Sequence, residues 1–318
     1  MDFELYRDHL VGVAYRMLGS VAEAEDAVQE AWLRWQSADR DAIAEPRGWL
    51  TTVVGRICLD QLKSARVRRE AYVGQWLPEP VVTRLADPTA LDPGEQAART
   101  DEVSVALLAV LERLTPEQRV AFVLHDVFDV PFAEIAPLLG VGVEAARQHA
   151  SRARRVVRDG APKHSADLAE QREVLTAFLR ACEQGDLSGL LAVLAPDAVI
   201  IGDGGGYGPA AKQPIVGAVQ VARMLLTLAR MAGERGDVIA EPVLINGDLG
   251  LLLAEPDAFN GRDVTAVMAF GYADGRITGV YNQMNPEKQD RVPEPDAARS
   301  IWRVGPRRQP ETRSNQVR

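Results

Sequence analysis

Residues 131–158 read PFAEIAPLLGVGVEAARQHASRARRVVR. The pattern predicts a short apolar helix over Phe132–Leu139, a turn over Gly140–Gly142, and a second helix from Val143 to about Arg158. This is the spacing of a helix-turn-helix, whose second helix lies in the major groove of DNA. The last twelve residues contain five arginines, more than the favourable placement of cations at a helix C-terminus requires. We predict that this helix contacts base edges and phosphates through Arg147, Gln148, Ser151, Arg152 and Arg155.

Three further helices are predicted before residue 70. The first covers residues 3–18, and the second begins at Ser20, three residues before Glu23, which is the spacing of a capping box. The third begins near Pro46, a residue favoured in the first turn of a helix. The apolar stripe of the second helix consists of Ala24, Ala27, Val28, Ala31, Trp32 and Trp35. We therefore predict an all-α bundle.

The next stretch, residues 70–102, differs in composition from the helical segments on either side. Its acidic sequence contains four prolines, Pro78, Pro80, Pro88 and Pro93. This composition is typical of a linker between domains. The triplet Trp76-Leu77-Pro78 is unusual in such a linker, because a solvated chain gains nothing from a Trp-Leu pair. We expect the triplet to dock on another part of the protein.

The second half of the chain changes character again. Two helices are predicted, over residues 165–184 and 218–231, and between and after them come five short apolar runs separated by turn signals. The runs cover residues 198–201, 242–245, 249–254, 265–272 and 277–284. This order predicts an α+β domain in which an antiparallel sheet wraps on helices. Residues 291–318 are rich in Pro and Arg, and we expect a poorly ordered tail in which Trp302 docks.

Composition excludes several classes of protein. The chain has 318 residues, 47% of them apolar, which is typical of two or three globular domains. No apolar run reaches the roughly 18 residues of a membrane span, and the N-terminus lacks the features of a signal peptide, so we expect a cytoplasmic protein. Two cysteines, Cys58 and Cys182, exclude a disulfide framework and a cysteine zinc site. All four histidines precede residue 165, so a histidine triad or metal site is not expected within the second half.

Charge is unevenly distributed along the chain. The net charge of −9 argues weakly against a nucleic-acid partner, but residues 161–290 alone carry −7. Two short stretches, residues 63–69 and 147–158, are strongly basic. Because phosphate contacts are screened over about 10 Å, such local stripes are sufficient for DNA binding in an acidic protein.

Three segments of the chain together resemble the sigma-70 superfamily, specifically the small extracytoplasmic-function type. Residues 107–157, which include the helix-turn-helix, resemble region 4. The segment MLGSVAEAEDAVQEAWLRW (residues 17–35) resembles region 2.2, and PRGWLTTVVGRICLDQLKSARVRRE (residues 46–70) resembles regions 2.3 and 2.4. The resemblance implies region 2 over residues 1–69, a linker over 70–102 and region 4 over 103–160.

The resemblance also implies roles for individual residues. The clamp helices of core RNA polymerase would be contacted by Asp26, Gln29, Glu30 and Arg34. The −10 element and the melted strand would face Trp49, Arg56, Lys63 and Arg66, whereas the −35 element would face the five residues of the helix-turn-helix. Two alternatives remain open from the residues alone: the acidic residues form a solvated helix face, and Trp49 belongs to the core.

The C-terminal half resembles a SnoaL-like domain of the nuclear-transport-factor-like cone fold, over residues 165–290. A subgroup of extracytoplasmic-function sigma factors carries such a domain, with a WLP motif in the linker, a DGGG motif and an NPDK-like motif. The corresponding residues here are Trp76-Leu77-Pro78, Asp203-Gly204-Gly205-Gly206 and Asn285-Pro286-Glu287-Lys288. Tyr207 stands where a basic residue is usual, which puts a salt bridge at that position in doubt, and Glu287 replaces Asp.

These observations favour a sigma factor without catalytic residues, metal or cofactor of its own. Its partners would be core RNA polymerase and promoter DNA, and its C-terminal domain would dock on the linker and regulate it. One alternative is a small-molecule sensor, since the cone fold usually encloses an apolar pocket. The other is a cyclase-type enzyme with Asp203 as general acid or base. Against that role, Asp203 is expected in a loop beside three glycines and has no histidine partner.

Overall fold

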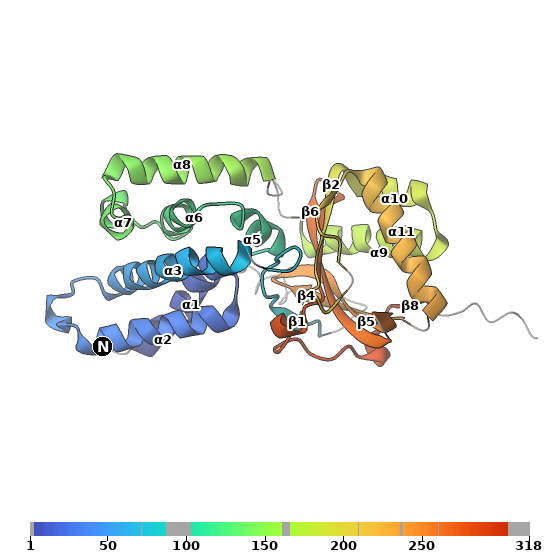
Figure 1. The fold of residues 1–318 in the computed structure, drawn as a ribbon, viewed down its shortest axis with the longest axis horizontal. Helices are drawn as coiled ribbons and strands as arrows, with labels where there is room; N and C mark the ends of the chain where they lie inside the picture. Colours follow the sequence, from blue (N-terminus) through green and yellow to red (C-terminus); the bar gives the residue numbers. More distant parts are fainter. Residues whose placement is uncertain are drawn as a thin grey trace, which may run out of the picture.

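The computed structural model describes residues 3–70, 72–86, 103–160, 166–208, 210–235, 238–259 and 261–304. Two sets of helices lie on one side of a curved sheet, and three further helices lie on its other side (Figure 1). The architecture agrees with the expected order of two all-α domains followed by an α+β domain. Within these residues, no helix is long and apolar enough to cross a membrane.

The first helical domain contains the helices α1 (Arg7–Leu18), α2 (Val21–Ser37) and α3 (Pro46–Glu70), with short 3-10 turns η1 (Phe3–Tyr6) and η2 (Arg40–Ala42). The predicted start of α2 is confirmed, because the Ser20 side chain accepts a hydrogen bond from the Glu23 backbone N–H. The assignment of Trp32 to the apolar stripe was wrong, since 38% of this residue is exposed. Ala31 and Trp35 occupy the buried face of α2, whereas Trp32, which directly follows Ala31 in the sequence, lies toward solvent.

The second helical domain consists of α5 (Val105–Leu111), α6 (Pro116–Phe122), a π-helical turn η4 (Val123–Val127), α7 (Phe132–Leu139) and α8 (Val143–Gly160). The predicted helix-turn-helix is confirmed, with Gly140 left-handed at φ 70° between its helices. Thr115 and Gln118 form a complete capping box at the start of α6. These local signals explain why the helix starts follow from the sequence.

The two helical domains share one hydrophobic core. Gly55 of α3 lies where a Cβ would be 3.0 Å from Leu124 and 3.2 Å from Leu138, so a glycine permits close approach of the second domain. The two domains are therefore packed against each other in this structure.

The C-terminal domain is built on an eight-stranded sheet. Seven of its strands follow the order β1-β4-β5-β6-β7-β2-β3, and the eighth, β8, pairs with β4 beside this path. Neighbouring strands are antiparallel except β2 and β7, which are parallel. The strands are β1 (Val82–Arg84), β2 (Leu194–Asp203), β3 (Ile215–Val216), β4 (Val238–Ile245), β5 (Asp248–Phe259), β6 (Arg262–Ala273), β7 (Arg276–Gln283) and β8 (Trp302–Val304). All five predicted strand segments are confirmed.

Each face of the sheet is covered. The helices α9 (Leu168–Gln184), α10 (Leu187–Val193) and α11 (Ala218–Arg235) pack on one face around Phe178 and Phe270. The other face packs against Leu77 of the linker and against Val105 and Ala106 of α5. The sheet therefore lies between its own helices and the linker with the second helical domain.

Two segments differ from expectation. Residues 82–84 of the predicted linker form strand β1 on the C-terminal sheet, paired with β4. Residues 291–304 of the predicted tail contain η6 (Ala297–Arg299) and β8, and Trp302 pairs with Ala240 of β4. Strands of two or three residues carry no recognisable period, and they form here because β4 offers backbone hydrogen-bonding groups. Residues 305–318 lie outside the described residues.

Candidate functional site

Asp203 is the centre of a cluster that binds the linker. It is the last residue of β2 and is fully buried, so the expectation of a loop setting was wrong. Its Oδ2 accepts hydrogen bonds from the Leu77 backbone N–H at 2.9 Å and from Lys288 Nζ at 2.7 Å. Its Oδ1 accepts from the Tyr72 hydroxyl at 2.6 Å. A buried carboxylate with this many donors is committed to binding the linker rather than to proton transfer.

The parallel pairing of β2 with β7 explains why two distant motifs meet. Asp203 is opposite Gln283 in the register, and Gln283 lies two residues before Asn285. The glycines after Asp203 permit the contact, because a Cβ at Gly205 would overlap the Asn285 side chain, and Gly205 has φ 55°. The DGGG and NPEK segments therefore lie side by side at the end of β2 and β7.

Lys288 completes the cluster from the opposite side. Its Nζ donates to the Leu77 carbonyl at 2.8 Å and lies 4.0 Å from the Trp76 ring centroid and 4.9 Å from that of Tyr72. An ammonium over two aromatic faces is stabilised by cation–π attraction as well as by its carboxylate partner. Burial, followed by the hydrogen bond to Asp203, raises the pKa of Tyr72. We call Tyr72, Trp76, Leu77, Asp203, Asn285 and Lys288 the linker-docking cluster.

The two departures from the family motifs contact each other. The Tyr207 hydroxyl donates a hydrogen bond to Glu287 at 2.9 Å, and this bond raises the pKa of Tyr207. The salt bridge that the sequence left in doubt at Tyr207 is not needed to hold the motifs together, because Asp203 pairs with Lys288. Pro286 begins the short 3-10 turn η5 (Pro286–Lys288) that carries Lys288 into the cluster.

The linker also contacts the first helical domain through Glu79, which sequence analysis missed. Its carboxylate Oε2 accepts from the Ser20 hydroxyl at 2.8 Å and from the Val21 backbone N–H at 2.7 Å, which caps the N-terminus of α2. Its own backbone N–H donates to the Gly19 carbonyl. Pro78, the last residue of the predicted triplet, is buried between these contacts and the cluster.

A second polar cluster holds the end of the described linker. Glu241 of β4 is fully buried and pairs with Arg84 at 3.0 Å and with Arg299 at 2.9 Å. Arg299 also donates to the Leu85 carbonyl. The sequence does contain an indication of this cluster, because Glu241 is the one charged residue within the otherwise uncharged strand VIAEPVLI.

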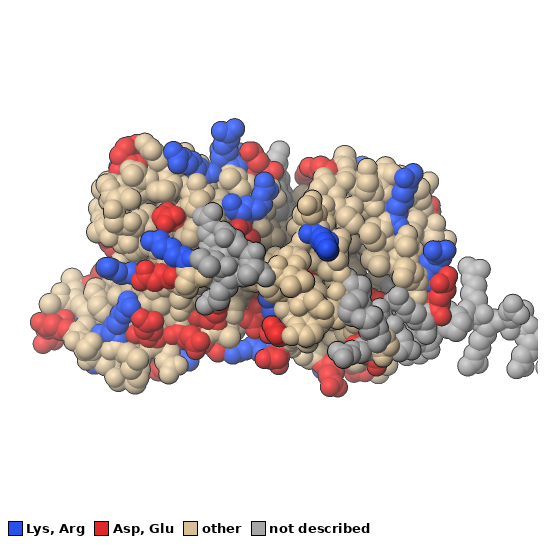
Figure 2. Space-filling model, in the orientation of Figure 1, with Lys and Arg blue, Asp and Glu red and all other residues tan. Residues whose placement is uncertain are grey.

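The helix-turn-helix presents a basic face to solvent. The five predicted DNA-contacting residues, Arg147, Gln148, Ser151, Arg152 and Arg155, are all exposed on α8, whereas Ala146, Ala150 and Ala153 are buried. Lys and Arg side chains gather over α8 in the space-filling view (Figure 2). Arg154 is instead paired with Asp126 at 2.5 Å. The exposed row fits a helix that reads a groove.

The four residues predicted to contact polymerase are exposed along α2. Asp26, Gln29, Glu30 and Arg34 lie on its outer face, with Glu30 and Arg34 paired at 2.5 Å. Beside them, Glu25 forms an ion pair with Arg291 of the C-terminal segment. The C-terminal domain thus reaches the helix that carries these residues.

The four residues predicted to face the −10 element differ in their burial and contacts. Trp49 is half-buried and packs 5.8 Å from Trp35, so it is part of the core and also lines a cleft. Arg56 is exposed. Lys63 lies 3.8 Å from Glu117 of the second helical domain. The side chain of Arg66 lies outside the described residues.

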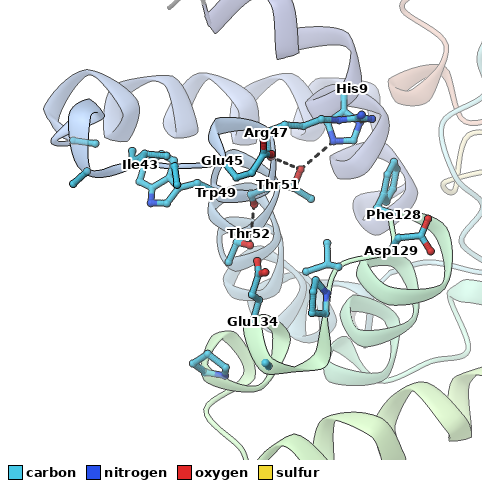
Figure 3. A pocket seen from close by; sticks show the side chains of 18 of the residues that line it. His9, Ile43, Glu45, Arg47, Trp49, Thr51, Thr52, Phe128, Asp129 and Glu134 are labelled. Carbon is cyan, nitrogen blue, oxygen red and sulfur yellow. Dashed lines mark hydrogen bonds between the residues drawn. The ribbon is translucent and has the colours of Figure 1, made fainter.

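The cleft beside Trp49 lies between the two helical domains on one side of their shared core and has a volume of about 1220 Å³. His9, Arg47 and Thr51 line it from α1 and α3, and Phe128 lines it from the second helical domain (Figure 3). Arg47 donates to His9 Nδ1, so His9 Nε2 carries the proton and donates to the Thr51 hydroxyl at 3.0 Å. Burial and the charges of Arg47 and Arg16 lower the pKa of His9 to about 4.

Among the described residues, no group of three His, Cys, Asp or Glu side chains is arranged to hold a metal ion. Cys58 and Cys182 are both buried as free thiols. Burial raises the pKa of Cys182 to about 12, so this thiol is not reactive at neutral pH.

Comparison with known proteins assigns the helical domains. Residues 3–68 match the family model for Sigma-70 region 2, and residues 104–156 match that for Sigma-70, region 4. The chain is 44% identical over 297 residues to the ECF RNA polymerase sigma factor SigJ of Mycobacterium tuberculosis, covering 90% of this chain and 92% of that protein. It is 36% identical over 287 residues to the probable ECF RNA polymerase sigma factor SigI of the same species, with the same coverage.

The whole fold has a counterpart among solved structures. The crystal structure of M. tuberculosis SigJ matches with a TM-score of 0.70 and 41% identity, covering 90% of this chain and 96% of that chain. The match therefore covers most of the chain. The chain belongs to the extracytoplasmic-function family of RNA polymerase sigma factors, which direct transcription initiation and are not enzymes.

Proposed function

We propose that the C-terminal domain of this sigma factor controls initiation by holding the linker, and through it the two helical domains, in a closed arrangement. The observation that carries the proposal is the pairing of buried Asp203 with the Leu77 backbone and with Lys288. A buried carboxylate that binds the linker backbone is a strong and specific tether. Core RNA polymerase and promoter DNA are the partners that compete with this arrangement.

The exposed face of α8 is the proposed −35 contact. Arg147, Gln148 and Arg152 can reach base edges in the major groove, and Arg155 can bind phosphate. Ser151 lies between them on the same exposed row. This assignment is supported by the burial of the alanines behind the row.

The proposed −10 contact is α3, with Arg56 and Lys63 for the phosphates and Trp49 for stacking on an unpaired base. Arg66 is included in this set because of its position in the segment that resembles region 2. The proposed polymerase contact is the outer face of α2, with Asp26, Gln29, Glu30 and Arg34. The exposure of Arg56 and of these four residues on α2 supports the assignment.

The packing of the two helical domains supports a closed state that does not read both promoter elements together. Gly55 of α3 lies against Leu124 and Leu138, and Lys63 pairs with Glu117. One face of the proposed −10 helix is therefore covered by the domain proposed to read the −35 element. Two separated DNA elements require two separated surfaces, so binding requires the helical domains to move apart.

A second candidate function is sensing of a small molecule by the same arrangement. A pocket of about 600 Å³ lies where the α1–α2 turn, the linker and the segment after β7 meet. Trp76, Glu79 and Arg291 line it. A ligand in this pocket would contact all three parts and would shift the balance between closed and open states.

The test of the proposed function is run-off transcription with purified core polymerase on a promoter of the family type. Asp203→Asn removes the charge that binds Lys288 while it preserves the side-chain shape. Asp274→Asn, in an exposed turn of the same domain, is the matched control. We expect Asp203→Asn to change transcript yield by about threefold or more and the control to leave it unchanged. Equal yields from all three proteins would refute control by linker docking.

A further inference from the structure

Asn246 occupies the turn between β4 and β5, and its side chain points out of its own domain. It has φ 52°, which Asn tolerates, and Gly247 follows it at φ 78°. An Asn-Gly pair is the usual sequence of a tight hairpin turn, so the turn alone accounts for the residue type. It does not account for burial, because only 4% of Asn246 is exposed.

A second turn in the same sheet provides the comparison. Asp274 and Gly275 connect β6 and β7 with the same backbone conformation, φ 50° and 68°. Asp274 is exposed, as turn residues usually are. The burial of Asn246 therefore has a cause beyond turn geometry.

That cause is a set of hydrogen bonds to three other parts of the chain. Asn246 Nδ2 donates to the Tyr15 hydroxyl of α1 at 2.8 Å and to the Val103 carbonyl, just before α5, at 3.0 Å. Its Oδ1 accepts from the Val81 backbone N–H of the linker at 3.1 Å. Both amide protons and the carbonyl oxygen are used, one bond each.

The bond to α1 continues into the linker. The Tyr15 hydroxyl, which accepts from Asn246, donates to the Glu79 carbonyl at 2.7 Å. Glu79 in turn caps α2 through Val21. Region 2, the linker and the start of region 4 thus meet at one buried amide, which belongs to the C-terminal domain.

We infer that Asn246 is a positioning residue that fixes region 2 and region 4 relative to the C-terminal domain. The amide has donors on one side and an acceptor on the other, so it is bound correctly only when all three parts are in place. Losing one part leaves a buried polar group unsatisfied, which is unfavourable. The effect of Asn246 on transcription rests on the proposed function, whereas its effect on domain geometry does not.

The test is a pair of interdomain distances in the full chain, measured by pulsed electron paramagnetic resonance. Spin labels at Asp8→Cys and Thr227→Cys report region 2 against the C-terminal domain, and labels at Asp159→Cys and Thr227→Cys report region 4. All three positions are exposed, whereas the native Cys58 and Cys182 are buried. Each pair is measured in the parent sequence and in the variants.

Asn246→Asp keeps the side-chain size and the turn preference, but it replaces the NH2 group and its two N–H donors with one acceptor oxygen, which lies against the Val103 carbonyl. We expect both distance distributions to broaden, with an approximately tenfold shift of the population away from the closed state. Asp274→Asn, the reverse change at the exposed turn, leaves both distributions narrow. Unchanged distributions for Asn246→Asp would overturn the inference.

Tyr15→Phe tests the same bond from region 2 without altering the turn. It removes the hydroxyl and is expected to broaden the region 2 distances more than the region 4 distances, because the Val103 bond remains. The double variant is expected to shift the region 2 distances no further than Asn246→Asp alone. Fully additive shifts would show that Asn246 does not act through Tyr15 and would also overturn the inference.

Run-off transcription with the same variants separates this inference from the proposed function. Altered distances with altered transcript yield support both. Altered distances with unchanged yield support the positioning role and refute control by the closed arrangement. Unchanged distances refute the positioning role whatever the yield.

Discussion

Arg291 and Glu25 form a two-pronged ion pair, with their nitrogen and oxygen atoms 2.9 and 2.5 Å apart. Arg291 follows the NPEK segment, and Glu25 stands beside Asp26 on α2. The hydrogen bonds from Arg291 lower the pKa of Glu25. The C-terminal segment therefore contacts region 2 at the edge of the proposed polymerase-binding face.

The first prediction concerns this contact. Arg291→Gln removes a competitor for the α2 surface, so we expect the affinity for core polymerase to rise. The pair is exposed, and such pairs contribute about 0–1 kcal/mol, so the gain is at most about fivefold. We expect this gain in affinity to become smaller as the salt concentration is raised from about 50 to about 300 mM, because salt screens exposed charges. The affinity for core polymerase is measured by fluorescence titration, with Arg230→Gln on α11 as the control. A lower affinity of the Arg291→Gln variant than of the parent protein would contradict the prediction.

The second prediction concerns Lys288 in the linker-docking cluster. Lys288→Met retains much of the aliphatic volume but leaves the buried Asp203 carboxylate without its cation. Removing one partner of a buried pair destabilises by about 3–5 kcal/mol. We expect the melting temperature to fall by several degrees and the linker to be cleaved faster by protease near Trp76. Tyr207→Phe, which removes only the exposed bond to Glu287, is expected to have a much smaller effect, and equal effects would argue against the cluster.

The third prediction is a pH dependence that arises at His9. The folded protein holds the pKa of His9 at about 4, below its usual 6.5. Between these values the unfolded chain binds a proton that the folded chain does not, so stability is full above pH 6.5 and falls as the pH is lowered. Protonation of Nδ1 also breaks the hydrogen bond from Arg47.

We expect His9→Gln to reduce this loss, because glutamine keeps a polar side chain and does not titrate. The measurement is the melting temperature of both proteins between pH 7.5 and about 4.5, a window set by the displaced pKa. As the pH is lowered, the melting temperature of the parent protein should fall further than that of the His9→Gln variant. Parallel curves would show that His9 does not contribute to acid sensitivity.

The fourth prediction concerns the basic face of α8. Because Arg152 is proposed to reach a base edge, Arg152→Ala is expected to weaken binding of the −35 duplex by about 1–3 kcal/mol and to relax the preference for one base pair. Loss of a phosphate contact would instead weaken binding to all sequences alike and reduce the salt slope of log K by about one. Titrations at several salt concentrations, with one substituted base pair at a time, distinguish a base contact from a phosphate contact. Arg230→Ala in the C-terminal domain is the control, and an equal loss of affinity for the −35 duplex in both variants would show that α8 is not part of the DNA interface.

Much of the helical fold could be predicted because its signals are local. The caps at Ser20 and Thr115 lie within four residues of the groups they bind, so sequence alone locates the helix starts. The bounds of α7 were predicted to the residue for the same reason. Trp32 was misassigned because the apolar stripe of α2 is filled by its neighbours Ala31 and Trp35.

The relationships that bring distant segments together could not be predicted in this way. Asp203 meets Lys288 because β2 pairs in parallel with β7, and nothing near either residue specifies that pairing. The family motifs supplied what local chemistry could not, since they marked both segments and the Trp76 triplet. Glu241 and Asn246 belong to no such motif, and their partners lie more than 50 residues away in sequence.

The closed arrangement is tested most directly by the distance between region 2 and region 4 before and after promoter binding. Spin labels at Asp8→Cys and Asp159→Cys lie on exposed positions of α1 and α8. We expect one short, narrow distance in the free chain and a longer one in the complex with core polymerase and promoter. We also expect Asp203→Asn to populate the longer distance without polymerase. The same short distance in the free chain and in the promoter complex would contradict the closed arrangement as a regulatory state.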